Sequence, residues 1–380
     1  MRASKRDDPL LWPRRLARAL VACTFALLLA GGLVTTYRVG MAVPDWPTTF
    51  GYGMFRYPLE RMLADFGVTV EHGHRLAASG VGLLSIAVLL VALRRAARSV
   101  RFVALAGLAV ELVAFASLAA AFDPEVGTSA ATLGLFGLTT ALFTKAAVTG
   151  GAPPLVRLAL AAHLGVVLQG LLGGSRVLAN HEGLAFLHGA FAQVVYALVF
   201  ALGVVTSRAW TDAAPPIESS AAPDLRRAAR AATALVYLQV ALGAWLRHSG
   251  LPLALGLHVL LALGVVGAIV ALAHQLDLAA RALADGSGAR RTLGRARGFL
   301  IGVLGLQIAL GIASTAAIYL WSGGFQGAVS IGEALGATAH VAVGALLLGS
   351  CSGTWLLAHR LLRSRGEAAP ALAPHLEVAA

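Results

Sequence analysis

Residues 71–75 read Glu-His-Gly-His-Arg, and they place a carboxylate, two imidazoles and a guanidinium at the start of an apolar run that continues to Leu93. An ionisable group inside hydrocarbon is costly, so such residues normally face the interior of a helix bundle and have a function. Three later histidines, His188, His258 and His340, occupy comparable positions in other apolar runs. Glu71, His74 and these three histidines are therefore the candidate functional residues.

The composition excludes a soluble globular domain. Hydrophobic residues make up 58% of the chain, charged residues only 13%, and the mean hydropathy is +0.78. These values predict a polytopic membrane protein. The net charge of +12 does not indicate nucleic-acid binding, because Lys and Arg accumulate on the cytoplasmic loops of membrane proteins. Cys23 and Cys351 both lie in apolar runs, so neither a disulfide framework nor a cysteine metal site is predicted.

A basic arm, residues 1–18, precedes the first apolar run. A cleaved signal peptide is the competing interpretation, but the run is long, has no Ala-x-Ala site before Tyr37 and is followed by further spans, so we expect a retained helix. Apolar runs of roughly 18 to 24 residues predict ten spans. They are residues 17–36, 71–93, 102–121, 130–149, 155–176, 184–206, 230–247, 253–274, 298–320 and 334–357.

The distribution of basic residues predicts the orientation of these spans. With ten spans, 24 of the 30 Lys and Arg residues fall on the side of the N-terminus, which is therefore expected to be cytoplasmic. The spans that carry His74, His188, His258 and His340 then all run from outside to inside. Each histidine lies four to six residues past the outer end, which predicts one layer about 6 to 9 Å deep.

The layer favours paired metal ligation over four separate structural histidines. A structural hydrogen-bonding role is the alternative for any single one of them. The remaining seven histidines do not share this depth, and His163 in particular enters from the cytoplasmic side. Glu111, near the middle of another span, either pairs with a polar group of the bundle or marks an additional site.

The chain divides into two halves in this reading. Residues 1–206 form an N-terminal half, which includes a helix pair at about 102–150; residues 207–229 form a cytoplasmic linker; residues 230–365 form a C-terminal half; and residues 366–380 form a disordered tail. A Leu-Gln-x-x-Leu-Gly motif supports duplication of a four-helix unit because it recurs in three of the predicted helices. Its copies are Leu168–Gly173, Leu238–Gly243 and Leu306–Gly311.

The donor types indicate which metal group the four histidines would hold. No cysteine lies near them, and beyond Glu71 there is no cluster of carboxylates, so zinc–thiolate, iron–sulfur and carboxylate-bridged di-iron sites are disfavoured. Two imidazoles from two helices, in a bundle rich in Gly and Ala, suit a haem with two histidine ligands. Two such pairs predict two haem sites, one in each half. A transporter with a histidine proton relay is the alternative.

The sequence resembles the haem A synthase family of bacterial and mitochondrial membrane enzymes, which oxidise haem O for terminal oxidases. The resemblance covers nearly the whole chain in order. It is carried by Gly31–Thr36, Pro44-Asp45-Trp46-Pro47, Glu71-x-x-His74-Arg75, the three Leu-Gln-x-x-Leu-Gly copies, and His188, His258 and His340.

The resemblance implies a fold, a reaction and a set of site residues. The fold is an all-α polytopic membrane protein of two pseudo-repeated four-helix bundles, here with two extra helices. His74 and His188 match the pair that holds the substrate haem, His258 and His340 match the ligands of a haem b cofactor, and Glu71 matches the catalytic carboxylate. The reaction is oxidation of a ring methyl to a formyl group by successive hydroxylation. For Glu71, a helix N-terminal charge favoured by the macrodipole is the alternative.

The resemblance also implies partners and a location. The protein would lie in the bacterial plasma membrane with its haem layer toward the outer side, contacting lipid, haem O and an electron donor or acceptor, with no nucleic-acid partner. Docking of a haem O synthase and formation of a homo-oligomer stay open. Arg75 and Arg176 are candidate contacts for haem propionates, and the long aromatic loop 37–70 is expected to cap the N-terminal site.

Two departures from the family pattern and one rival function remain. Many members have eight spans, whereas residues 101–150 add two here, and the first outer loop lacks the cysteine pair of some members, which excludes a thiol relay there. The rival function is a dihaem membrane electron carrier that passes electrons between a quinol and a partner protein. Glu71, present beside one histidine pair and not the other, favours the enzyme.

Overall fold

The computed structural model describes residues 8–120, 130–149, 152–321 and 329–367, and it is almost entirely helical. Nine helices in this part of the chain are long and apolar enough to cross a membrane. The predicted all-α polytopic membrane fold is therefore confirmed. The remaining predicted span, 130–149, corresponds to α6 (Ala130–Val148), whose apolar portion with described side chains, Gly134–Val148, is shorter than the other nine.

The contacts divide the chain into two units, Met1–His188 and Gly189–Ala380, and the division falls inside α8 (Glu182–Val205). The first unit contains α1 (Leu11–Thr36), the short helices η1 (Met54–Arg56) and α2 (Leu59–Ala64), then α3 (Phe66–Leu93), α4 (Arg98–Ala120), α6 and α7 (Pro154–Ala179). The boundary predicted at residue 206 was drawn from composition alone and stays a prediction.

Helix α3 forms the centre of the first unit, because it packs against α1 on one side and α7 on the other. It begins at Phe66, five residues before the predicted start, since the Asp65 carboxylate accepts a hydrogen bond from the Val68 N–H at 2.9 Å and caps the helix. Glu71 therefore lies beyond the first turn of α3. The macrodipole acts mainly on the first turn, so it does not account for this carboxylate.

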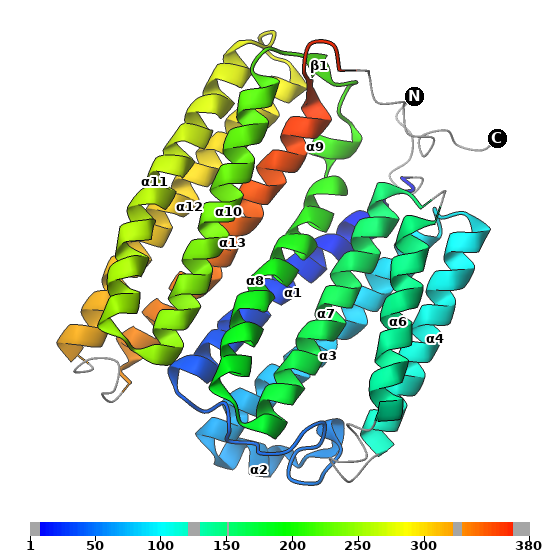
Figure 1. Cartoon of the computed structure of the whole chain (residues 1–380), viewed down its shortest axis with the longest axis vertical. Helices are drawn as coiled ribbons and strands as arrows, with labels where there is room; N and C mark the ends of the chain where they lie inside the picture. Colours follow the sequence, from blue (N-terminus) through cyan, green and yellow to red (C-terminus); the bar gives the residue numbers. More distant parts are fainter. Residues whose placement is uncertain (1–7, 121–129, 150–151, 322–328, 368–380) are drawn as a thin grey trace. The chain divides into compact units, whose positions relative to one another are not determined.

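The two extra helices predicted at 102–150 are α4 and α6, which lie side by side (Figure 1). Phe143 of α6 packs against Gly107 of α4, where a Cβ atom would overlap its ring. Helix α6 also packs against α7, and Ala114, Phe136 and Val167 form a small core between the three helices. The pair is thus an additional layer on the α7 side of the first unit.

The second unit contains the C-terminal part of α8, α9 (Arg208–Thr211), β1 (Ile217–Glu218), α10 (Ala222–Ser249), α11 (Pro252–Arg281), α12 (Gly288–Ala316), the π-helical turn η2 (Ala317–Trp321), α13 (Ile331–Leu361) and β2 (Leu362–Arg363). Helix α10 packs against α11 and α13, and α12 packs against the same two helices. The four long helices after α8 therefore form a closed four-helix bundle in which α11 and α13 are diagonal (Figure 1).

The predicted linker 207–229 is folded within the second unit. Strand β1 pairs in parallel with β2, directly after α13. The Arg360 guanidinium of α13 donates hydrogen bonds to the carbonyl oxygens of Trp210, Ala213 and Ala214 at 2.6 to 3.1 Å. The segment is therefore tied to the end of α13. Of the tail predicted at 366–380, residues 368–380 lie outside the described residues, and Glu367 pairs with Arg226.

The C-terminal part of α8 contacts α13 through glycines. Phe200 lies against Gly349 and Gly353, and a Cβ at Gly349 would come within 2.8 Å of the Phe200 Cγ. The ring is held in turn by Tyr196, at 6.2 Å between centroids. Small residues at such positions let two membrane helices approach closely.

Gly349→Ala is expected to destabilise the protein by about 1 to 3 kcal/mol, because the new methyl group would displace Phe200 at its Cβ and Cγ, which cannot rotate away. Thermal unfolding of the purified protein in detergent measures this. Gly302→Ala in α12 is the matched control, since nothing lies within 4 Å of its Cβ position. Equal melting temperatures for the two variants would contradict the packing described here.

Candidate functional site

The second unit brings His258 of α11 and His340 of α13 together across its bundle. Their ring centroids are 6.2 Å apart and their planes are inclined by 68°. An imidazole nitrogen lies about 2 Å from a metal ion, and about 1 Å from its own ring centroid, so two imidazoles on opposite sides of one ion have centroids about 6 Å apart. The centroid spacing of this pair is that of two imidazoles on one metal ion, and both ring nitrogens of His340 lie within 3.3 Å of Gln307.

The first unit holds the other two histidines, one on α3 and one near the start of α8. His74 lies eight residues after the start of α3, and His188 lies six residues after the start of α8. The two side chains are close enough to interact electrostatically. Within the described residues, no group of three or more His, Cys, Asp or Glu side chains comes together as a metal site. Each pair would therefore supply two protein ligands to an ion.

A glycine of the preceding long helix faces each of the four imidazoles. A Cβ atom built on this glycine would lie 2.9 to 3.0 Å from the histidine Cε1 atom, closer than real Cβ contacts allow without a shift. The contacts are Gly31–His74, Gly173–His188, Gly243–His258 and Gly311–His340. This glycine–histidine contact recurs at all four histidines, so each helix backbone lies close to the edge of an imidazole ring. The final glycine of the Leu-Gln-x-x-Leu-Gly motif is needed because a larger residue would overlap that ring.

The glutamine of the same motif lies one turn before the glycine and also contacts the histidine. Gln169 and Gln239 each donate from Nε2 to the backbone oxygen of His188 and His258, at 2.9 Å in both cases. Gln307 lies with its Nε2 3.3 Å from His340 Nε2, and its backbone oxygen lies 3.2 Å from His340 Nδ1. The motif glutamine thus contacts three of the four histidines, at the backbone or the ring, while α1, with Leu27 in the corresponding place, contributes glycine alone.

Several buried polar atoms of this layer have no protein partner. They are Nδ1 of His74 and of His258, and Oε1 of Gln169, Gln239 and Gln307. A buried polar atom without a partner costs about 1 to 3 kcal/mol, so such atoms are uncommon and call for a reason. Five of the ten such atoms among the described residues lie around the four histidines, so a ligand bound there would meet unpaired polar groups.

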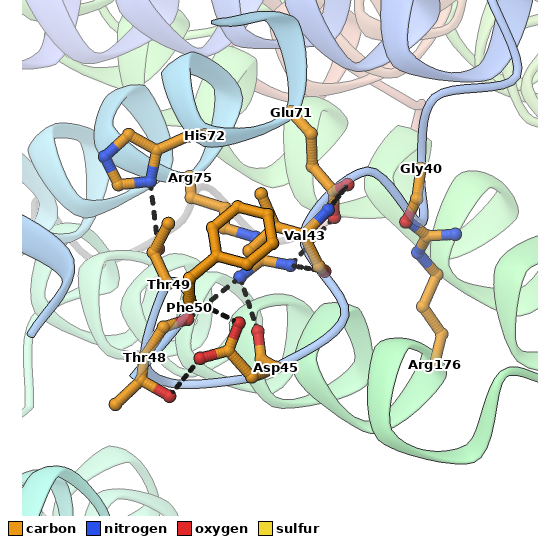
Figure 2. A network of polar contacts seen from close by, with 10 residues as sticks. All are labelled: Gly40, Val43, Asp45, Thr48, Thr49, Phe50, Glu71, His72, Arg75 and Arg176. Carbon is orange, nitrogen blue, oxygen red and sulfur yellow. Dashed lines mark hydrogen bonds and ion pairs between the residues drawn. The ribbon is translucent and has the colours of Figure 1, made fainter. Parts of the chain in front are cut away.

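The loop between α1 and α3 is held by Glu71 and Arg75 (Figure 2). Glu71 is buried, with 2% of its surface exposed. Its Oε1 accepts from Arg75 Nη2 at 2.8 Å, and its Oε2 accepts from the Val43 N–H at 2.9 Å. Arg75 also donates to the backbone oxygens of Val43, Asp45 and Thr48, at 2.7 to 3.2 Å. The ion pair therefore fixes the loop onto α3.

Helix α7 holds the same loop from the other side. Arg176 Nη2 donates to the Gly40 carbonyl at 2.6 Å, and the Trp46 ring lies against Gly174, where a Cβ atom would overlap it. The Trp46 ring thus contacts α7 at the residue next to Gly173, and Gly173 contacts His188. The loop spans α3 and α7 beside the first histidine pair, which agrees with the predicted cap over this site.

The loop has its own internal fold, built on Asp45. The carboxylate accepts hydrogen bonds from the Thr48 hydroxyl at 2.5 Å and from the Phe50 and Gly51 N–H groups at 2.8 and 2.9 Å. Phe50 and Gly51 both have positive φ, 49° and 77°. Burial by itself would raise the pKa of the Asp45 carboxyl, but the hydrogen bonds from Gly51, Thr48 and Phe50 outweigh it and lower the pKa below its ordinary value.

The structure gives each predicted site residue a place. It brings His258 and His340 together, puts His74 and His188 in one unit, and holds Glu71 three residues from His74. Arg75 and Arg176, predicted as propionate contacts, bind loop carbonyls instead of standing free, and propionate binding stays a prediction. Reasoning from the sequence missed Gly31 and the Trp46–Gly174 contact. Gly31 could have been found from the sequence, because the Leu-Gln-x-x-Leu-Gly motif places a glycine in the helix before each of the other three histidines.

Comparison with known protein families, with curated proteins and with solved structures found no match to this chain. The site therefore rests on its own geometry. That geometry is His258 and His340 brought together between two helices, His74 and His188 on two helices of the first unit, a glycine facing each imidazole, and the buried Glu71–Arg75 ion pair with its ordered loop beside His74.

Asp45→Asn is expected to reduce the protection of the loop amides from hydrogen exchange at neutral pH. It should also remove the pH dependence of that protection. Because the folded state lowers the pKa of Asp45, its ionised form adds stability above the unfolded pKa, and that stability is lost as pH falls through the folded-state pKa. Hydrogen exchange of the Phe50 and Gly51 amides, corrected for intrinsic rates, measures this. Asp212→Asn, outside the loop, is the control, and unchanged protection in Asp45→Asn would refute the role.

Proposed function

We propose that this protein is a haem A synthase, which oxidises the ring methyl of haem O to a formyl group within the membrane. In this proposal His258 and His340 hold a haem b cofactor, and His74 and His188 hold the substrate haem. The observation that carries the proposal is the 6.2 Å spacing of His258 and His340 between diagonal helices, combined with the glycine contact that recurs at all four histidines.

The donor set and its surroundings fit a haem. Two imidazoles per site leave the other coordination positions of an iron to a macrocycle, which a haem supplies. The unpartnered polar atoms of the layer give a bound macrocycle groups to interact with. The glycines keep the backbone close to the imidazole edges, and the Gln307 contacts restrict where the ring of His340 lies. Contacts of this kind orient metal-binding histidines.

Haem iron would supply the redox chemistry, and the protein would supply placement and proton handling. Glu71 lies close to one turn from His74 on α3, so its carboxylate projects near the substrate position. Each carboxylate oxygen can accept more than one hydrogen bond, so Glu71 can accept a proton from the substrate side while still bound to Arg75 and Val43. The ion pair with Arg75 holds the carboxylate in place.

A dihaem membrane electron carrier is the second candidate, and one observation favours it. Both Glu71 oxygens bind partners in the loop network, which gives the carboxylate a structural reason to stand beside the first pair only. An electron carrier would use the same four histidines and would modify neither haem. In either case we place the protein in a bacterial plasma membrane with its N-terminus in the cytoplasm. Haem O synthase and an electron donor or acceptor are the partners to be tested.

The test of the function is the mass of the pigments extracted from the purified protein. A haem A synthase made in cells that contain haem O should yield haem b together with haem O, its hydroxylated form or haem A. Haem b alone, in two equivalents, would favour the electron carrier. Protein free of any tetrapyrrole under haem-replete expression would overturn both.

His258→Ala and His340→Ala are each expected to remove the spectrum of the haem b, because each histidine would provide one of its two axial ligands. Visible absorption spectra of the purified variants measure this. His274→Ala is the control, since His274 is on α11 as well but is exposed and outside the layer. A normal low-spin spectrum in both variants would contradict the assignment.

Glu71→Gln is expected to abolish the formyl product while haem b stays bound, since Gln has nearly the same size and lacks the charge. Arg75→Lys is the matched variant, because it disturbs the same loop and leaves the carboxylate. Product composition by mass, in cells with each variant as sole synthase, separates the roles. Loss of product in Glu71→Gln alone supports chemistry at Glu71; equal loss in both assigns Glu71 to loop closure; near-normal haem A from Glu71→Gln removes it from the mechanism.

A further inference from the structure

Three polar side chains meet inside the first unit, away from the four histidines. They are Ser85 of α3, Glu111 of α4 and His163 of α7, and they are 2%, 3% and 1% exposed. Ser85 Oγ lies 2.8 Å from His163 Nδ1, and His163 Nε2 lies 2.9 Å from Glu111 Oε2. Phe143 of α6 covers the imidazole with its ring at 5.5 Å between centroids. The cluster therefore joins both extra helices to α3 and α7.

The hydrogen bonds of Ser85 fix where one proton must be. A serine hydroxyl has a single hydrogen, and the Ser85 Oγ lies 2.7 Å from the Gly82 carbonyl oxygen, to which it donates. It can then only accept from His163, so His163 Nδ1 carries a hydrogen. The imidazole faces Glu111 with its other nitrogen, Nε2.

One more proton must lie between His163 Nε2 and Glu111, because a hydrogen bond at 2.9 Å between them needs one. The pair is then either an imidazolium beside a carboxylate or a neutral imidazole beside a carboxylic acid. Both forms have zero net charge and hold one proton more than a neutral imidazole beside a carboxylate. Zero net charge is the state that a buried site in hydrocarbon favours.

Release of that proton requires little movement. If the Ser85 hydroxyl turns from Gly82 to His163 Nδ1, the imidazole keeps one hydrogen on Nε2 for Glu111, and the cluster has lost one proton. The Ser85–His163 and His163–Glu111 hydrogen bonds persist with the heavy atoms in place, and the hydrogen bond from Ser85 to the Gly82 carbonyl is lost. The charged residues of the surrounding helices do not compensate either state, since Arg101 of α4, Lys145 of α6 and Arg157 of α7 are exposed, and Arg14 of α1 pairs with Asp8.

We propose that Glu111, His163 and Ser85 form a buried site that binds one exchangeable proton inside the membrane bundle. The ligand is a proton, shared between the imidazole and the carboxylate, and the serine hydroxyl adjusts to its presence. The alternative is a static pin in which the same hydrogen bonds only fasten α4 to α3 and α7. A pin does not exchange its proton over the pH range in which the protein is folded. The proposal does not depend on haem binding.

The experiment is nitrogen NMR of the full-length protein labelled with ¹⁵N-histidine, followed across the pH range of stable folding. In the wild type, His163 Nδ1 should change from a protonated nitrogen to a hydrogen-bond acceptor as pH rises, while Nε2 stays protonated at the high-pH end. Because the site is buried, exchange should be slower than at exposed histidines such as His274. His163 signals that keep one form throughout would overturn the proposal in favour of the pin.

Glu111→Gln should remove or alter the pH-dependent change of the His163 signals, because it replaces the carboxylate that shares the proton with Nε2. Glu182→Gln, which removes a carboxylate from the start of α8, is the matched control and should leave the titration unchanged. A titration of His163 that is the same in Glu111→Gln as in the wild type would also overturn the proposal.

Ser85→Ala keeps the Glu111–His163 pair. It therefore provides a second test of the proposal if the Glu111→Gln variant does not fold. It should keep a one-proton titration but remove the hydroxyl partner of Nδ1, which identifies the His163 signal. Ser350→Ala in α13 is the control, since that hydroxyl is also buried and bonded to its own helix, at the Leu346 carbonyl, without an imidazole. An Nδ1 signal that is identical in Ser85→Ala and the wild type would contradict the serine's role.

Discussion

Hydrocarbon offers no hydrogen-bond partner, and this constraint decides where the polar side chains of the chain lie. Every buried polar group of a membrane span must find its partner in the protein or in a bound ligand. In the first unit, Glu71 is bonded to Arg75 and to the loop, and Glu111 is bonded to His163. Polar atoms around the four histidines lack such partners.

The closeness of the helices depends on the opposite kind of residue. Glycines face each imidazole of the layer, Gly107 receives Phe143, and Gly349 receives Phe200. The hydrophobic effect does not drive association between helices in lipid. Small residues instead stabilise helix packing by allowing close van der Waals contact. The glycines that contact the aromatic and imidazole rings therefore also allow the helices to approach closely. The position of the histidines and the packing of each unit depend on the same residues.

The loop after α1 shows how a connection can belong to a site. Arg75 binds three backbone carbonyls of the loop, Arg176 binds a fourth, and Trp46 lies on α7 beside the first histidine pair. The second pair has no comparable set of contacts among the described residues. The glycine contact recurs at all four histidines and the glutamine contact at three of them, so it is the loop contacts of Arg75, Arg176 and Trp46 that give the first unit its own features.

The sequence by itself determined the all-α membrane fold, the helices that carry the histidines and the repeated Gln and Gly positions, because composition and period report local structure. It also placed the loop near His74, since the loop leads directly into α3. Only the tertiary structure decided which partners Glu71, Glu111 and Trp46 have. Those contacts join residues 28 to 128 positions apart, and they depend on which helix faces meet, which no local pattern encodes.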